Sequence, residues 1–337
     1  MELTTVWFVA IAFFWVGYFA LEGFDFGVGM LLPVLAKDDT ERRVMINTIG
    51  PVWDGNEVWL LVAGGATFAA FPHWYATLFS GFYLPLLLIL VALIARGVAF
   101  EYRHKRHDAQ WQSRWDTAIT FGSLVPAVLW GIAFANLVAG VPIDADKEFT
   151  GGLLTLLNPF GLLGGLVTLS LFITHGATFI ALKTAGDIRV RARDLAWRSG
   201  LVAIVLTIFF LTWLQAKTGS PASAAVFAVA ALLLVVGVRS AYVGREGVSF
   251  AGTFGAIALA VTGMFVALFP DVMPSTTDVA FSLTTTNAAA TDYSLTIMTW
   301  AAAIFTPMVL GYQAWTYWVF RQRIGTHHIP TVELAAK

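Results

Sequence analysis

The sequence predicts an all-α polytopic membrane protein with nine transmembrane helices. Hydrophobic residues make up 58% of the 337 positions and charged residues only 12%, whereas a soluble domain carries about a quarter charged residues. Apolar stretches near the length of a membrane span, about 20 residues, recur along the whole chain. The predicted spans are 6–33, 54–71, 75–95, 117–139, 157–182, 199–216, 222–242, 250–269 and 295–320.

These spans account for nearly all of the chain, so we expect residues 1–337 to form a single transmembrane domain. Most prolines, such as Pro33, Pro72 and Pro221, fall at predicted span ends, where a missing N–H does least harm. Residues 41–50 are too short to span and predict an amphipathic helix on the membrane surface. The first stretch lacks a basic leader region and is expected to be a retained span rather than a cleaved signal.

The basic residues predict the topology. The gaps after spans 1, 3, 5 and 7, together with the tail after span 9, hold 18 of the 20 Lys and Arg residues, with Arg96 assigned to the third span's gap and Lys337 to the tail. Only Lys147 and Lys217 fall on the other side. Cytoplasmic loops carry an excess of Lys and Arg, so the N-terminus is expected outside and the C-terminus in the cytoplasm.

Five acidic residues break the apolar pattern: Glu22, Asp25, Asp54, Glu57 and Asp116. Glu22 and Asp25 are three residues apart, and so are Asp54 and Glu57, so each of these two pairs shares a helix face. An Asp at membrane depth costs roughly 2.5–3.5 kcal/mol even on the lenient insertion scale. The topology puts all five in the cytoplasmic half of the membrane. Because buried carboxyls can hold and pass protons, they predict a proton path from the cytoplasm.

A structural interpretation of the same acids stays open. Asp54, after Pro51, and Asp116, before Thr117, sit where an N-cap is expected. The acids could also pair with nearby arginines, for which the sequence offers Arg42, Arg43, Arg96 and Arg114.

His175 is the only histidine well inside a predicted span. A b-type haem usually needs two axial ligands. The spacing of the other residues indicates no second ligand to accompany His175, so a hydrogen-bonded core histidine is favoured over a haem ligand. The chain has no Cys, which excludes disulfides and iron–sulfur clusters. No metal site is predicted. The net charge of −1 gives no sign of a nucleic-acid partner.

Small residues predict close helix contacts. Gly23 and Gly27 form a GxxxG pair around Asp25, which suits a helix-packing seam that also shields Asp25 from lipid. The Gly64–Gly65 pair and the glycines at 161, 164 and 165 are interpreted in the same way.

Several strings resemble subunit II of the cytochrome bd quinol oxidases. The most specific are GFDFGVGML at 23–31 and WDGNEVW at 53–59. DTERR at 39–43, GGATFAA at 64–70, NPFGLL at 158–163, THGAT at 174–178, MPSTT at 273–277 and MTW at 298–300 follow in the same order.

The resemblance implies two four-helix bundles plus a peripheral helix, in a bacterial cell membrane. It implies a haem-free chain beside subunit I, which holds haems b and d and oxidises quinol while oxygen is reduced. Asp25, Asp54 and Asp116 match the family's proton-delivery carboxylates, and Glu57 is expected to assist. Small accessory subunits are candidate partners, and quinone or membrane lipid is a candidate ligand of this chain.

Two other functions remain open. Intramembrane acids and nine spans would also suit an independent proton-coupled transporter, although no broken helices in corresponding halves mark a substrate site. The chain could also be a purely structural subunit whose acids are all paired. A transporter would act alone, whereas an oxidase subunit would purify with a haem-bearing partner.

Overall fold

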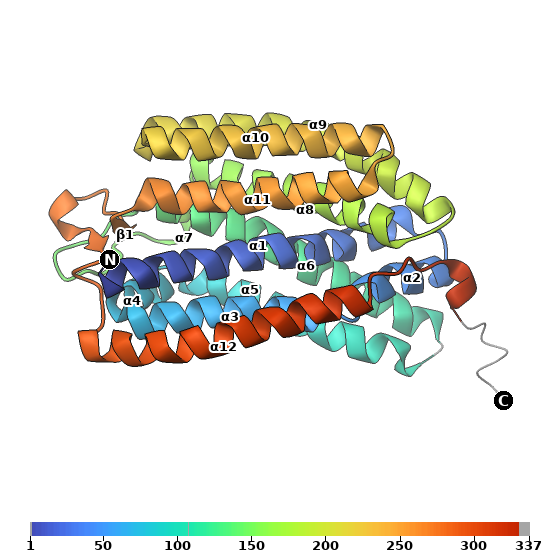
Figure 1. Ribbon diagram of the computed structural model, residues 1–337, viewed down its shortest axis with the longest axis horizontal. Coiled ribbons are helices and arrows are strands. Elements are labelled where there is room, and N and C mark those ends of the chain that lie inside the picture. Colours follow the sequence, from blue (N-terminus) through green and yellow to red (C-terminus); the bar gives the residue numbers. More distant parts are fainter. Residues whose placement is uncertain (1, 107, 330–337) are drawn as a thin grey trace.

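Long helices lie side by side along one axis in the computed structural model, which describes residues 2–106 and 108–329 (Figure 1). α9 and α10 form one edge of the bundle, α3 and α12 form the other, and α1 and α8 lie between them. The long helices are α1 (Leu3–Leu35), α3 (Trp53–Ala70), α5 (Tyr83–Tyr102), α6 (Ala109–Ala139), α8 (Pro159–Lys183), α9 (Asp187–Thr218), α10 (Pro221–Tyr242), α11 (Glu246–Leu268) and α12 (Asp292–Val319).

Short elements join the long helices. They are the helices α2 (Asp39–Ile49), α4 (Pro72–Gly81) and α7 (Leu153–Leu156), the 3₁₀ turns η1 (Arg103–Lys105), η2 (Val279–Phe281) and η3 (Thr326–His328), and the strands β1 (Asp271–Met273) and β2 (Leu283–Thr284). The two strands pair antiparallel, with Asp271 opposite Thr284. The predicted all-α class is confirmed, since this small sheet is the only one among the described residues.

Eight helices in the described part of the chain are long and apolar enough to cross a membrane. The helix at the predicted span 54–71, α3, is not among them. Its 18 residues begin with a polar turn that contains Asp54, Asn56 and Glu57, which lowers its hydropathy. The ninth crossing therefore depends on whether α3 spans the bilayer.

The predicted span 75–95 needs correction, because the chain breaks at Phe82 into α4 and α5. Phe82 leaves the helical conformation (φ −102°, ψ 19°). Pro85 lies in the first turn of α5, where its missing N–H cannot bond back to the preceding turn. The helix then continues past residue 95 to Tyr102, so Arg96 lies inside a transmembrane helix and not in the gap predicted for it.

The predicted basic gaps meet at one end of the bundle, here called the basic end. Arg103 of η1 contacts Asp39 of α2 at 2.6 Å, and Arg191 of α9 contacts Glu41 of α2 at 2.6 Å. The segment after α12 joins them through a bridge between Thr184 and Ile324. The gaps that the topology assigned to one side therefore lie together, although Lys337 falls outside the described residues.

The remaining gaps meet at the opposite end. Ala290 N donates to Ala70 O at 2.8 Å, which ties the segment before α12 to the end of α3. Lys147 Nζ donates to Ala280 O at 3.1 Å, which ties the α6–α7 loop to the same segment. The start of α1 also lies at this end (Figure 1).

Glycines let α1 and α8 meet backbone to backbone. A Cβ at Gly27 would lie 2.0 Å from Phe172 O, and a Cβ at Gly176 would lie 2.5 Å from Gly27 Cα. The GxxxG prediction is thus confirmed for this seam. It is wrong for Gly64 and Gly65, because neither has an atom within 4 Å of a built Cβ. Both line an open cavity instead.

Candidate functional site: a buried acidic cluster around Arg96

Arg96 lies at the centre of a buried charged cluster. Its Nη1 donates to Glu22 Oε1 from α1 and to Glu57 Oε1 from α3, the latter at 2.8 Å. The side chains of Arg96 and Glu22 are fully buried, and that of Glu57 is 22% exposed. The guanidinium also faces the rings of Phe26 and Phe100, at 4.8 and 5.2 Å. Three helices thus bring one positive and two negative groups together in an apolar interior.

Asp25 lies one turn beyond Glu22 on α1 and is also fully buried. Asn56 Nδ2 donates to Asp25 Oδ2 at 2.6 Å. The other carboxylate oxygen, Oδ1, has no hydrogen-bond partner among the described residues. Ionisation of Asp25, Glu22 and Glu57 together would leave two negative charges that Arg96 does not balance. An apolar interior opposes such uncompensated charge, so proton uptake by these carboxyls is a natural way to neutralise it.

Asp54 lies at the basic end of α3, one turn from Glu57. It is exposed, and its side chain makes no hydrogen bond or salt bridge to any residue that the structure describes. Asp54 lies inside the first turn of α3, and Val52 holds the N-cap position without a side-chain cap bond. The capping interpretation of Asp54 is therefore wrong.

Asp116 belongs to a second cluster at the basic end. Arg103 Nε and Nη2 donate to its two oxygens at 2.5 and 3.2 Å, and Arg42 Nε lies 3.7 Å away. α6 begins at Ala109, with Asp108 as its N-cap, so Asp116 does not open the helix. Its capping interpretation is wrong, whereas an ion pair with Arg42 is present and the principal partner is Arg103.

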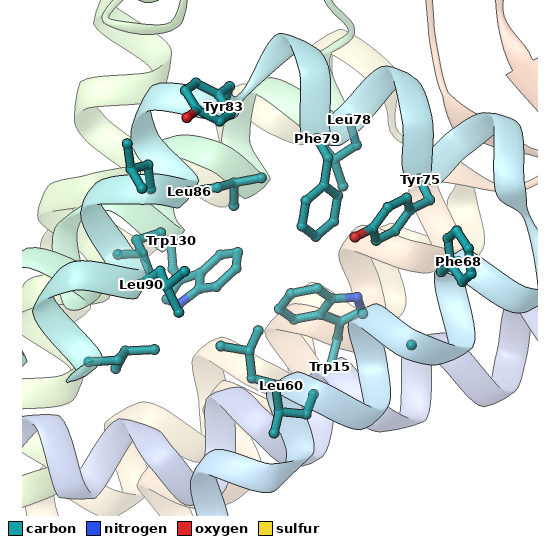
Figure 2. Close-up of a pocket in the computed structure, with 16 residues that line it drawn as sticks. Trp15, Leu60, Phe68, Tyr75, Leu78, Phe79, Tyr83, Leu86, Leu90 and Trp130 are labelled. Atoms are coloured by element: carbon teal, nitrogen blue, oxygen red, sulfur yellow. The ribbon is translucent and has the colours of Figure 1, made fainter. Parts of the chain in front are cut away.

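One cavity adjoins the Asp116 cluster, and a second, apolar cavity is lined by none of the acids. A polar cavity of about 250 Å³ opens beside Asp116 and is lined by Pro33, Arg42, Ser113, Asp116, Thr117, Thr120 and Phe121. A larger one, about 460 Å³, lies between α3 and the α4–α5 segment (Figure 2). Trp15, Trp130, Phe79 and several leucines line it, and the Tyr75 hydroxyl points into it. Its apolar lining suits a hydrocarbon chain.

His175 is fully buried on α8 with both ring nitrogens engaged. Nδ1 lies 2.7 Å from Thr253 Oγ1, and Nε2 lies 3.1 Å from Ala20 O. The ring stacks on Phe250 with centroids 4.8 Å apart. No group of three or more His, Asp or Glu side chains within the described ranges is placed to hold a metal ion.

The sequence names Arg96 and Arg42 among the possible partners of the acids, and both pair with them, but Arg103 and the neutral residues around Asp25 are missed. The charge of Arg96 predicts the end of the apolar span there, whereas the GVAF segment after it continues the helix. Asn56, Gln313 and Tyr317 are neutral residues whose contacts join positions more than 250 apart, for example Tyr317 OH to Asn56 Oδ1 at 2.8 Å. No local signal in the sequence marks them.

Comparison with known proteins identifies the family of the chain. The family model for cytochrome bd terminal oxidase subunit II matches residues 3–320. The chain belongs to this family. Subunit 2 of the cytochrome bd ubiquinol oxidase of Bacillus subtilis is 43% identical over 329 residues, covering 96% of this chain and 97% of that protein. Cytochrome bd-I ubiquinol oxidase subunit 2 of Escherichia coli is 36% identical, covering 97% and 96%.

The solved structure of the bd oxidase from Geobacillus thermodenitrificans contains a chain with the same fold, with a TM-score of 0.77 at 16% identity, over 95% of this chain and 99% of that one. As a subunit II, this chain is part of a quinol oxidase complex, and the eight apolar helices of its described residues make it a multi-pass protein of a bacterial membrane.

Proposed function

We propose that this chain is a haem-free subunit that supports a haem-bearing subunit I and contributes a proton path from the cytoplasmic side to the site of oxygen reduction. One observation carries the proposal. Three carboxyls and a single guanidinium are packed in an apolar interior, an arrangement that is costly and that marks proton relays in membrane proteins.

The order of the acids along the helices suggests the route. Asp54 is the second residue of α3, at the basic end, and Glu57 is one turn deeper. Asp25 is ten residues before the end of α1 at Leu35, about 15 Å at 1.5 Å per residue. A proton entering at Asp54 would reach Glu57, then the Arg96 cluster and Asp25. Asp116, beside its polar cavity, would assist at the same end.

The topology belongs to the same proposal. We infer that α3 crosses the membrane as the ninth span, that the basic end faces the cytoplasm, and that the N-terminus lies outside. The helices would divide into two four-helix bundles with α12 as the peripheral helix, of which only 6% of the most apolar stretch is buried. Its exposed face would then meet lipid or another subunit.

The haems b and d of the complex belong, in this proposal, to subunit I, together with the oxidation of quinol. The cavity beside Trp15 is a candidate place for the hydrocarbon chain of a quinone or lipid, since its lining offers apolar contacts and few polar groups. Small accessory subunits would attach to the same complex.

Replacing Asp25 tests the proton path. In the purified complex, Asp25→Asn keeps the shape and the contact with Asn56 but cannot ionise. We expect oxygen consumption to fall by a factor on the order of ten or more, with the haem absorbance spectrum unchanged. Asp292→Asn, an exposed residue in the first turn of α12 at the opposite end, is the matched control. Loss of the haem spectrum in Asp25→Asn would make Asp25 structural.

A purely structural subunit is the second candidate, and the ion pairs of Glu22, Glu57 and Asp116 with arginines favour it. Under that function, Asp25→Asn and Glu57→Gln would both leave turnover unchanged. A proton-coupled transporter would act without a haem-bearing partner. Copurification of a haem protein with this chain would therefore exclude the transporter and leave the two oxidase-subunit functions.

A further inference from the structure

A one-way chain of hydrogen bonds leads from α3 and α12 to Asp25. Trp59 Nε1 donates to Gln313 Oε1 at 2.9 Å, and Gln313 Nε2 donates to Asn56 Oδ1 at 3.1 Å. Asn56 Nδ2 then donates to Asp25 Oδ2 at 2.6 Å. Tyr317 OH reinforces the chain by donating to Asn56 Oδ1 at 2.8 Å.

The direction of this chain is fixed by its first member. An indole N–H can only donate, so the oxygen of the Gln313 amide must face Trp59. The NH₂ group of Gln313 then faces Asn56, which turns the Asn56 oxygen away from Asp25 and its NH₂ group toward it. Trp59 itself is held firmly, because its ring lies against Gly17, where a Cβ would be 2.1 Å from the indole.

We propose that α12 is a positioning element for Asp25: Gln313 and Tyr317 lock the Asn56 amide as a donor to Oδ2, which leaves Oδ1 as the atom that takes up and releases the proton. Oδ2 accepts from an amide that has no acceptor to offer it, so a proton on Oδ2 would face another hydrogen. Oδ1 is buried and has no hydrogen-bond partner among the described residues. The inference rests on the proposed proton path through Asp25.

This role also explains polar residues on a helix that packs so little. Among the described side chains of α12, only Leu295 is fully buried, and most apolar ones are exposed. Yet Gln313 and Tyr317 face inward, toward Asn56. Asp25 is otherwise faced by Glu22 of its own helix, by Glu57 of α3 and by Arg96 of α5.

The test uses the whole purified complex and two readouts, oxygen consumption and its solvent isotope effect in D₂O. Gln313→Glu preserves shape, but a carboxylate that accepts from Trp59 cannot donate to Asn56, so the Asn56 oxygen keeps only the Tyr317 donor and faces a negative charge that favours turning its NH₂ group away from Asp25. We expect turnover to fall roughly three- to tenfold and the isotope effect to rise, because proton delivery becomes limiting. The double variant Gln313→Leu/Tyr317→Phe should do the same.

Tyr312→Phe is the matched control, since it removes an exposed hydroxyl from the same helix, and it should behave as wild type. Asp25→Asn is measured in parallel. If it slows turnover while both α12 variants keep the wild-type rate, or lose rate without a larger isotope effect, the positioning role is wrong although the proton path stands. If Asp25→Asn itself turns over normally, the proton path fails and this inference fails with it. If the larger changes prevent assembly, the same two readouts are measured on Tyr317→Phe alone.

Discussion

Arg96 and Glu22 form an ion pair in which neither side chain has any exposed surface. Arg96 lies six residues before the end of α5 and Glu22 lies in α1, so the pair joins two helices through residues that are 74 positions apart. Glu57 of α3 shares the same guanidinium nitrogen. Such a pair contributes little stability by itself, but removing one member leaves an uncompensated buried charge. Arg96 is therefore the residue on which the three-helix arrangement most depends.

Replacing Arg96 should show this dependence. Arg96→Met keeps the length of the side chain and removes its charge, which leaves Glu22 and Glu57 facing each other. We expect a loss of stability of about 3–5 kcal/mol, seen as a lower Tm of the detergent-solubilised complex. Arg198→Met is the control, because its pair with Asp194 is exposed on α9 and such pairs are worth about 1 kcal/mol or less. The argument fails if the two variants melt alike.

The α1–α8 seam provides a second prediction. Gly27→Ala places a Cβ against the backbone oxygen of Phe172, so the helices must separate. We expect a cost of about 1–3 kcal/mol, and a measurable loss of assembled complex. Gly247→Ala is the control, since a Cβ at this exposed position in α11 meets nothing within 4 Å. Equal yields and equal Tm values for both variants would contradict the close packing.

Much of the fold could be predicted from the sequence because a membrane span is a composition signal. Length and hydropathy alone marked the apolar helices, and the basic residues sorted the gaps into two sets that do lie at two ends. The signal weakened where polar residues enter a span. Arg96 ended the third predicted span too early, and Asp54, Asn56 and Glu57 left α3 short and polar.

The acids of the candidate site could be predicted from the sequence, but the residues that hold Asp25 could not. Carboxyls are rare in apolar stretches, so Asp25 and Glu57 were visible in the sequence. Arg96, the partner of Glu57, was among the arginines that the sequence offered. The amide that holds Asp25 was not visible, because the contacts of Asn56 with Gln313 and Tyr317 depend on how α12 lies against α3. The glycine pair at 64–65 had the composition of a packing seam but lines a cavity, since composition does not tell which face of a helix meets a neighbour.

Acid pH should loosen the contact between α2 and α9. Burial alone would raise the pKa of the Glu41 carboxyl, but hydrogen bonds from Arg191 at 2.6 Å and from Lys37 N at 2.7 Å outweigh it and hold that pKa below its ordinary value. The folded protein thus binds fewer protons here than the unfolded chain. The stabilisation is present above the unfolded pKa and is lost as pH falls through the folded one.

The measurement is Tm against pH for the wild-type complex and for Glu41→Gln. The wild type should lose more Tm than the variant as pH falls below the ordinary carboxylate range, and the curves should converge at the acid end. Asp38 caps α2 through Glu41 N and is intact in both proteins, so its effect cancels. Parallel curves at every pH would show that the Glu41 contact adds no pH-dependent stability.

Replacing His175 separates a packing role from haem ligation. His175→Gln disturbs contacts to Thr253 and Ala20 O in the interior, and we expect a stability cost of about 1–3 kcal/mol. The haem-to-protein ratio of the complex should stay that of the wild type, because both ring nitrogens are already engaged within the protein. Thr253→Ala, which removes one of these partners, should lower Tm in the same direction with the same haem ratio. Loss of one haem per complex in His175→Gln, but not in Thr253→Ala, would assign His175 to the metal.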